Sequence, residues 1–99
     1  MDKFLLKDNI EKLSKNKKYL FENIMNIIGY YNNLIFLYGI NLEHKNNTIV
    51  KDSIIKMKDS YKKIKNNSNE EYKKILTEVF LSDKKFITLK EAIEFIKNN

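Results

Sequence analysis

LFENIMNIIGYYNNLIFLY, the run from Leu20 to Tyr38, overlaps the most apolar stretch of the chain, Ile24 to Ile40, and has the periodicity of a helix. Its apolar residues recur at alternating steps of four and three, which places them along one face of an α-helix. The same phase extends toward the start of the chain, and the whole seam is Leu6, Ile10, Leu13, Leu20, Ile24, Ile27, Tyr31, Leu34 and Tyr38. A second column at Phe21, Ile28 and Ile35 widens this face, which predicts burial against more than one neighbour.

The seam predicts one long helix over roughly residues 3–38, with a turn at Ser14–Lys18 between two helices as the alternative. Asp2 is a candidate N-cap because its carboxylate can accept the free amides of a first helical turn. Gly39 suits the left-handed position that often follows a helix. Gly29, inside the helix, costs about 1 kcal/mol relative to Ala, so we expect it to mark close packing against another helix.

A second long helix is predicted over about residues 48–66, after a loop at residues 41–47. Its apolar residues again alternate four and three, and they are Val50, Ile54, Met57, Tyr61 and Ile64. The polar run Asn66–Asn69 then ends the pattern. Two seams of this length in one chain predict a pair of long helices packed against each other.

Two capping boxes predict where the shorter C-terminal helices begin. In this motif the hydroxyl of the first residue and the carboxylate of the fourth each satisfy a free amide of the first turn. Ser68 with Glu71 fits the start of a helix of about residues 69–82. Thr88 with Glu91 fits the start of a last helix after a short linker.

The fold class predicted from these patterns is all-α, with residues 1–99 forming a single helical domain. We expect an antiparallel hairpin of long helices closed by one or two short C-terminal helices, with a four- or five-helix bundle as the near alternative. The chain contains no Pro and two Gly, so it is poor in the residues that tight turns and sheets use. The residues expected in the core are Ile24, Ile28, Leu34, Ile54, Tyr61, Ile75 and Val79.

Catalytic and metal-binding chemistry is poorly supplied in this sequence. The chain has no Cys and a single His, His44, which follows Glu43 in the predicted loop. One His beside one carboxylate cannot hold a structural zinc ion, and two separated Gly residues do not make a phosphate-binding loop. We therefore expect a non-enzymatic protein with no cofactor, no metal and no small-molecule substrate.

Localisation is predicted from the lack of targeting segments. The unbroken apolar run Leu34–Ile40 is far shorter than the roughly 18 residues that a membrane span needs. The first eight residues lack the apolar core and small-residue cleavage site of a signal peptide. We expect a cytoplasmic protein.

Positive charge is the strongest compositional signal. All 19 basic residues are Lys, and the formal net charge is +6. Because Lys, Asn and Ile share AT-rich codons, an AT-rich genome is an alternative explanation for this charge. On the second long helix, however, four lysines share one narrow stripe that could contact phosphates or an acidic partner, with three more near residue 15 adding charge. These candidates are Lys51, Lys58, Lys62 and Lys65, with Lys15, Lys17 and Lys18.

The function expected first is stoichiometric binding of a protein partner, as an inhibitor, an immunity factor or an accessory subunit, of the kind borne by phages or plasmids. A coiled-coil seam left uncovered would pair with a second copy, giving a homodimer, or with another protein. Tyr19 and Tyr30 lie near the edge of the seam and are candidate contacts at the rim of such an interface.

Two other functions remain open. The first alternative is sequence-independent binding of a DNA or RNA backbone through the lysine stripe; the lack of Arg disfavours base reading. The second is binding to a membrane surface, against which the Asn residues inside the most apolar helix argue.

Overall fold

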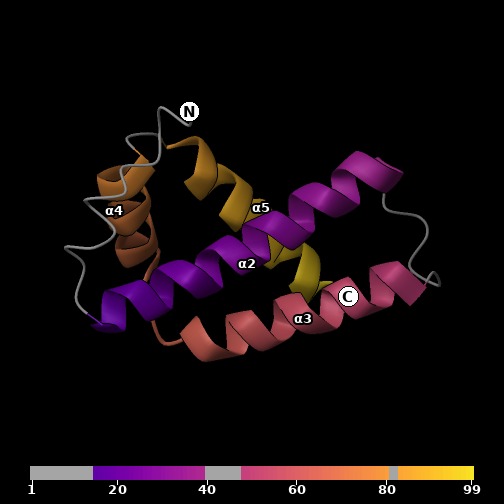
Figure 1. Ribbon diagram of the computed structural model, residues 1–99, viewed down its shortest axis with the longest axis horizontal. Helices are drawn as coiled ribbons and strands as arrows, with labels where there is room; N and C mark the ends of the chain where they lie inside the picture. The colour runs from indigo at the N-terminus through magenta and orange to yellow at the C-terminus, as the bar shows by residue number, and fades with distance from the viewer. Residues whose placement is uncertain (1–14, 40–47, 81–82) are drawn as a thin grey trace.

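The computed structural model describes residues 15–39, 48–80 and 83–99, and within those ranges it contains four helices and no strand. The helices, shown in Figure 1, are α2 (Lys15–Tyr38), α3 (Thr48–Ile64), α4 (Asn69–Phe80) and α5 (Lys84–Lys97). This confirms the all-α fold class and the arrangement of a long hairpin closed by shorter C-terminal helices. No helix in the described ranges is long and apolar enough to cross a bilayer.

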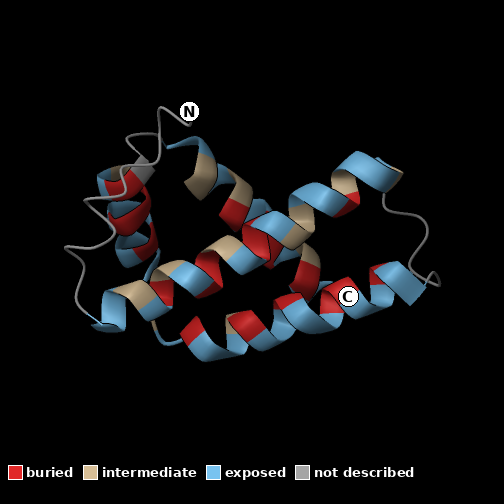
Figure 2. Cartoon of the chain, in the orientation of Figure 1, coloured by how far each residue is buried: buried red, intermediate tan, exposed pale blue. Residues whose placement is uncertain are grey.

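The hairpin of α2 and α3 forms the main interface of the molecule. The two helices run antiparallel (Figure 1) and share the most extensive contact between any two elements. Their apolar seams face each other, so Figure 2 shows the buried residues on the inner sides of the ribbons. Those buried seam residues are Leu20, Ile24, Ile27, Ile28 and Leu34 on α2 and Val50, Ile54, Met57 and Ile64 on α3. The described part of the predicted seam is therefore an intramolecular core.

Helix α5 covers one side of the hairpin. The ring of Phe95 lies 5.7 Å from the ring of Tyr31 on α2, centroid to centroid. On α3, the ring of Tyr61 lies 5.8 Å below the ammonium group of Lys97. Figure 1 shows α5 crossing behind α2, with its last turn beside α3. Its buried residues Leu89 and Ile96 belong to the same core.

Helix α4 closes the end of the hairpin where α2 begins and α3 ends. The amide of Glu71 donates to the hydroxyl of Ser68 at 3.3 Å, which confirms the part of the predicted capping box that Ser68 supplies. The hydroxyl of Tyr72 donates to the carbonyl of Ile64 at 2.8 Å, which ties α4 to the last residue of α3. Tyr72, Ile75, Leu76 and Val79 are buried in the common core.

The predicted start of the last helix is wrong. Helix α5 begins at Lys84, and Thr88 lies one turn inside it, where its hydroxyl donates back to the carbonyl of Lys84 at 3.1 Å instead of capping. The amides of Phe86 and Ile87 already bond the carbonyl of Asp83. Phe86 is three residues before buried Leu89, so the apolar face of α5 extends back by one turn.

Gly29 lies inside α2 and Gly39 directly follows it, and the two predictions about them have different outcomes. Gly39 has φ of 83° and its amide donates to the carbonyl of Ile35 at 2.8 Å, which confirms the left-handed helix end. Gly29 is exposed, and a Cβ built on it would meet no heavy atom within 4 Å. The expectation that Gly29 marks close helix packing is therefore wrong.

The predicted core is confirmed with one difference. Ile24, Ile28, Leu34, Ile54, Ile75 and Val79 are buried. Tyr61 is only partly buried, because its ring lies at the edge of the core under Lys97 and keeps some contact with solvent.

Several predictions fall outside the described residues. They are the N-cap at Asp2, the seam positions before residue 15, and the loop at residues 41–47 with His44. The alternative prediction places a turn at Ser14–Lys18. Residues 15–18, the described part of that segment, are helical instead.

Candidate functional site

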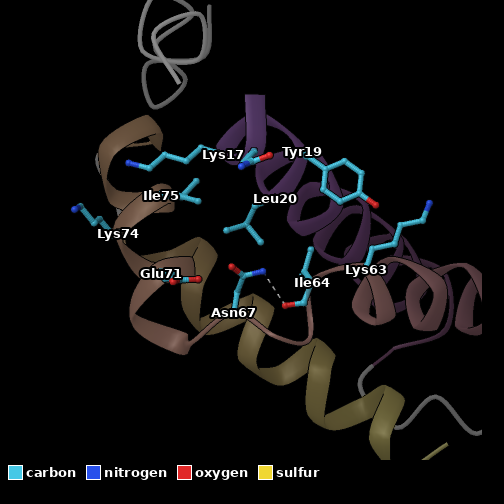
Figure 3. Close-up of a pocket in the computed structure, with 10 residues that line it drawn as sticks. Lys17, Tyr19, Leu20, Lys63, Ile64, Asn67, Glu71, Lys74 and Ile75 are labelled. Atoms are coloured by element: carbon cyan, nitrogen blue, oxygen red, sulfur yellow. Dashed lines mark hydrogen bonds between the residues drawn. The ribbon is translucent and has the colours of Figure 1, made fainter. Parts of the chain in front are cut away.

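A hollow of about 550 Å³ lies where α2, α3 and α4 meet. Figure 3 shows the side chains of Leu20 and Ile75 pointing into it from two different helices. Together with Ile64 they form an apolar floor, and all three residues are buried. The lining is completed by Asn16, Lys17, Tyr19, Lys63, Asn67, Glu71 and Lys74.

The rim of this hollow is polar and mostly basic. Three lysines reach it from three helices: Lys17 from α2, Lys63 from α3 and Lys74 from α4. Their aliphatic stems line the hollow, while the ammonium groups of Lys63 and Lys74 extend outward (Figure 3). Asn67 is held at the rim because its side-chain amide donates to the carbonyl of Ile64 at 3.1 Å. Such a site offers apolar burial at its floor and positive charge at its edge.

A second hollow, of about 400 Å³, lies farther along the same pair of helices. It is lined by Asn26 and Tyr30 from α2 and by Ile55, Lys56, Asp59, Ser60 and Lys63 from α3. The ammonium group of Lys56 lies 5.7 Å from the centroid of the Tyr30 ring, within the range of a cation–π contact. Lys63 lines both hollows and pairs with Asp59 at 3.3 Å.

The two hollows lie along the same pair of helices and share Lys63 in their linings, and we call them together the α2–α3 groove. Tyr19 and Tyr30 are eleven residues apart, so on an ideal helix they point within about 20° of the same direction and about 16 Å apart along the axis. The neighbouring residues Tyr31 and Tyr61 make the contacts with α5 instead. The groove therefore opens on a side of the hairpin that α5 leaves uncovered.

Each of the two predicted rim aromatics lines one of the two hollows. Tyr19, 49% exposed, lines the larger hollow, and the partly buried Tyr30 lines the smaller one. Sequence reasoning missed Glu71, Lys74 and Ile75, because their place in the groove depends on how α4 packs. The heptad phase could have indicated Asn16 and Asn26, which share the Tyr19–Tyr30 side of α2.

The predicted lysines separate into two groups. Lys51, Lys58, Lys62 and Lys65 are all exposed on α3 and on the turn that follows it. Lys17 belongs instead to the rim of the groove. Lys15 is exposed and Lys18 is partly buried in the first turn of α2.

The titratable groups in the described ranges bear on two properties, metal binding and protonation near neutral pH. No three His, Cys, Asp or Glu side chains in those ranges are placed to hold a metal ion. Burial raises the pKa of the Tyr72 hydroxyl to about 12, with smaller contributions from Tyr61 and Glu71. Burial, and then the charge of Glu91, raise the pKa of Tyr31. Both tyrosines therefore stay neutral near pH 7, which suits packing and hydrogen bonding.

No protein-family model matches this chain, and no curated protein and no solved structure matches it. The groove and the charge distribution are therefore the basis on which a function can be argued.

Proposed function

We propose that this protein acts stoichiometrically, by holding an α-helical segment of a protein partner in the α2–α3 groove. The observation that carries the proposal is the alignment of two hollows along one side of the hairpin, with Tyr19 in one and Tyr30 in the other. An amphipathic helix bound in a groove presents apolar anchors at steps of three and four residues. About 16 Å between the two tyrosines corresponds to three turns of such a helix.

The chemistry of the groove favours a partner segment with apolar anchors and acidic flanks. Leu20, Ile64 and Ile75 offer an apolar floor. The lysines that line the groove are Lys17, Lys56, Lys63 and Lys74, against the two acids Asp59 and Glu71. Because four lysines stand against two acids, the rim is positive overall, and charge complementarity favours an acidic partner.

The role that fits such a groove is that of an inhibitor, an immunity factor or an accessory subunit in the cytoplasm. In each of these roles one chain occupies one partner and no chemistry is performed. Binding of a helix beside α2 and α3 would bury the exposed apolar surface of Tyr19 and Ile55, which are 49% and 63% exposed among the described residues. Such a role requires a hollow that fits a helix and a charge complementary to it. The hollows and lysines of the α2–α3 groove support both requirements.

The first test uses a designed peptide and residue-resolved NMR. The probe is a helical peptide of about 16 residues with Leu anchors at steps of three and four and Glu on both flanks; its control carries Lys in place of Glu. We expect the acidic peptide to shift the amide signals of residues 16–30 and 55–75 and the basic peptide to leave them unchanged. Shifts spread evenly over all exposed lysines, or none at millimolar peptide, would contradict the proposal.

Matched variants locate the binding. Y19A/Y30A removes both groove aromatics and should weaken the acidic peptide at least tenfold. F36A/I87A removes two exposed apolar side chains outside the groove, 86% and 56% exposed, and should change the affinity less than twofold. Photo-crosslinkers at positions 19 and 30, compared with positions 36 and 87, then test whether a partner from the source cells contacts the groove in a one-to-one complex.

A further inference from the structure

We propose that α3 carries a second binding surface, for the phosphate backbone of a nucleic acid, along a row of lysines completed by Lys97 of α5. We call this row the lysine ridge and define it as Lys51, Lys58, Lys62, Lys65 and Lys97. It is independent of the α2–α3 groove, so either site can exist without the other.

The geometry of α3 makes the ridge narrow and long. Steps of seven and four residues keep Lys51, Lys58 and Lys62 within an arc of about 40° on an ideal helix, and Lys65 directly follows the last residue of α3. The eleven steps from Lys51 to Lys62 cover about 16 Å of the helix axis, and Lys65 extends the row beyond it. All four side chains are exposed. A straight row of ammonium groups of this length can follow successive phosphates of one strand.

The fold adds a fifth lysine that is distant in sequence. The ammonium group of Lys97 lies 5.8 Å from the centroid of the Tyr61 ring. Tyr61 is three residues after Lys58 and four before Lys65, so it is their neighbour on the helix surface. The last turn of α5 lies beside α3 in Figure 1. The cation–π contact with Tyr61 therefore places Lys97 next to the ridge.

Acidic residues on α3 point away from the ridge. Asp52 and Asp59 lie roughly 80–100° from Lys51 and roughly 60–80° from Lys62 around the helix axis. Asp59 pairs with Lys63 at the groove, on the other edge of α3. On α5, Glu94 lies one turn before Lys97 and is the acid nearest to it in sequence on that helix. The ridge thus carries five positive charges on an edge of α3 from which the two aspartates are turned away.

One feature favours a nucleic-acid backbone over a lipid surface as the occupant, and another indicates how that backbone would be bound. A helix that binds a lipid surface inserts a broad apolar face, but the apolar face of α3, with Val50 and Met57, is buried in the core. The chain has no Arg, the residue that makes most bidentate contacts with guanine. Lysines alone act as point charges on phosphates, so the binding is independent of base sequence.

The test measures fluorescence anisotropy with a labelled duplex DNA and a labelled single-stranded RNA, at low and at physiological salt. We expect wild-type protein to bind at micromolar concentration at physiological salt, with log affinity falling linearly with log salt. Each slope, divided by about 0.9 per contact for the duplex DNA and about 0.7 for the single-stranded RNA, gives the number of phosphate contacts with that backbone. Loss of all binding at physiological salt would overturn the proposal.

Two charge-matched variants separate the ridge from net charge. K51E/K58E/K62E/K65E changes the ridge, and K17E/K56E/K63E/K74E changes the groove rim; each replacement alters the charge by two, so both variants go from +6 to −2. We expect the ridge variant to bind at least 30-fold more weakly and the groove variant less than fivefold more weakly. Circular dichroism checks that both keep their helices. Equal losses of affinity in the two variants would show that net charge alone causes the binding, and would overturn the ridge as the binding site.

Two other anionic ligands complete the test. Poly-glutamate of matched charge and vesicles containing phosphatidylserine are added in place of the nucleic acid. Weaker binding of both than of the oligonucleotides supports a phosphate-backbone site. Equal or tighter binding of either one would overturn the choice of a nucleic acid and assign the ridge to an acidic protein or a lipid surface.

The variant K97Q tests the fifth lysine of the ridge, with the other four ridge lysines intact. It should weaken nucleic-acid binding about threefold, and an unchanged affinity would remove Lys97 from the ridge.

Discussion

The hydroxyl of Tyr72 lies 2.8 Å from the carbonyl oxygen of Ile64 and donates a hydrogen bond to it. Ile64 is the last residue of α3, so its carbonyl has no partner from its own helix. The main-chain and side-chain amides of Asn67 donate to the same oxygen at 3.0 and 3.1 Å. Three donors thus fix the turn between α3 and α4, next to the larger hollow of the groove.

Replacing Tyr72 by Phe should lower the free energy of unfolding by about 1 kcal/mol, measured by urea denaturation. The loss stays modest because Asn67 continues to donate to the Ile64 carbonyl. Tyr19→Phe is the matched control: Tyr19 is 49% exposed, and removing its hydroxyl should change stability by less than about 0.3 kcal/mol. A larger effect at Tyr19 than at Tyr72 would contradict this account of the turn.

The protein should lose stability as the pH rises from about 10 to about 12. Burial raises the pKa of Tyr72 from 10.0 to about 12, so in this window the folded state holds a proton that the unfolded state releases. The stabilisation is complete below pH 10 and is lost as the pH passes through the folded pKa. For Tyr72 the loss is on the order of 2–3 kcal/mol.

Urea denaturation at a series of alkaline pH values, with tyrosinate absorbance as a second readout, checks this expectation. Tyr72→Phe removes the largest titrating contribution and should flatten the profile. Tyr31 has a raised pKa for the same main reason, burial, and contributes in the same direction. A stability that does not change between pH 10 and 12 would be incompatible with a buried, neutral Tyr72.

Neighbouring isoleucines on α3 provide a sharp test of the core. Ile54 is 8% exposed and Ile55 is 63% exposed. Ile54→Ala should cost about 2–5 kcal/mol because it leaves a cavity between the helices. Ile55→Ala should cost less than about 0.5 kcal/mol. Similar losses for the two variants in thermal or urea denaturation would show that the seam of α3 is assigned to the wrong face.

The two glycines should respond to alanine in opposite directions. At Gly29 the space around a Cβ is open, so Gly29→Ala should raise the free energy of unfolding by up to about 1 kcal/mol. At Gly39 the φ of 83° is strained for any side chain, so Gly39→Ala should lower it by about 1 kcal/mol. Differential scanning calorimetry of both variants measures the two shifts, and a shared sign would contradict the assignment of the helix end.

Much of the fold was predictable because it depends on local patterns. The four-three spacing that places Ile24, Leu34 and Ile54 on inner faces is a property of single helices, and all three are buried. Ser68 was predictable as a cap for the same reason, since its partner is three residues away. Thr88 shows the limit: its motif is the same, but the apolar face that includes Phe86 made the helix begin earlier.

The groove was predictable only in part. Tyr19 and Tyr30 could be placed near an interface because their position relative to the seam is fixed by the helix itself. Lys74 and Ile75 could not, since they reach the hollow through the docking of α4 on the end of the hairpin. Lys97 could not be joined to the α3 lysines either, because its contact with Tyr61 spans 36 residues of sequence.

The packing of Phe95 on Tyr31 has a consequence for the order of folding. This contact closes a loop of 64 residues, whereas α2 and α3 are consecutive in the chain. Loop-closure entropy rises with length, so the hairpin should form in the rate-limiting transition state and α5 should dock after it. Phe95→Leu should then accelerate unfolding while leaving the folding rate nearly unchanged, and stopped-flow kinetics would measure both rates.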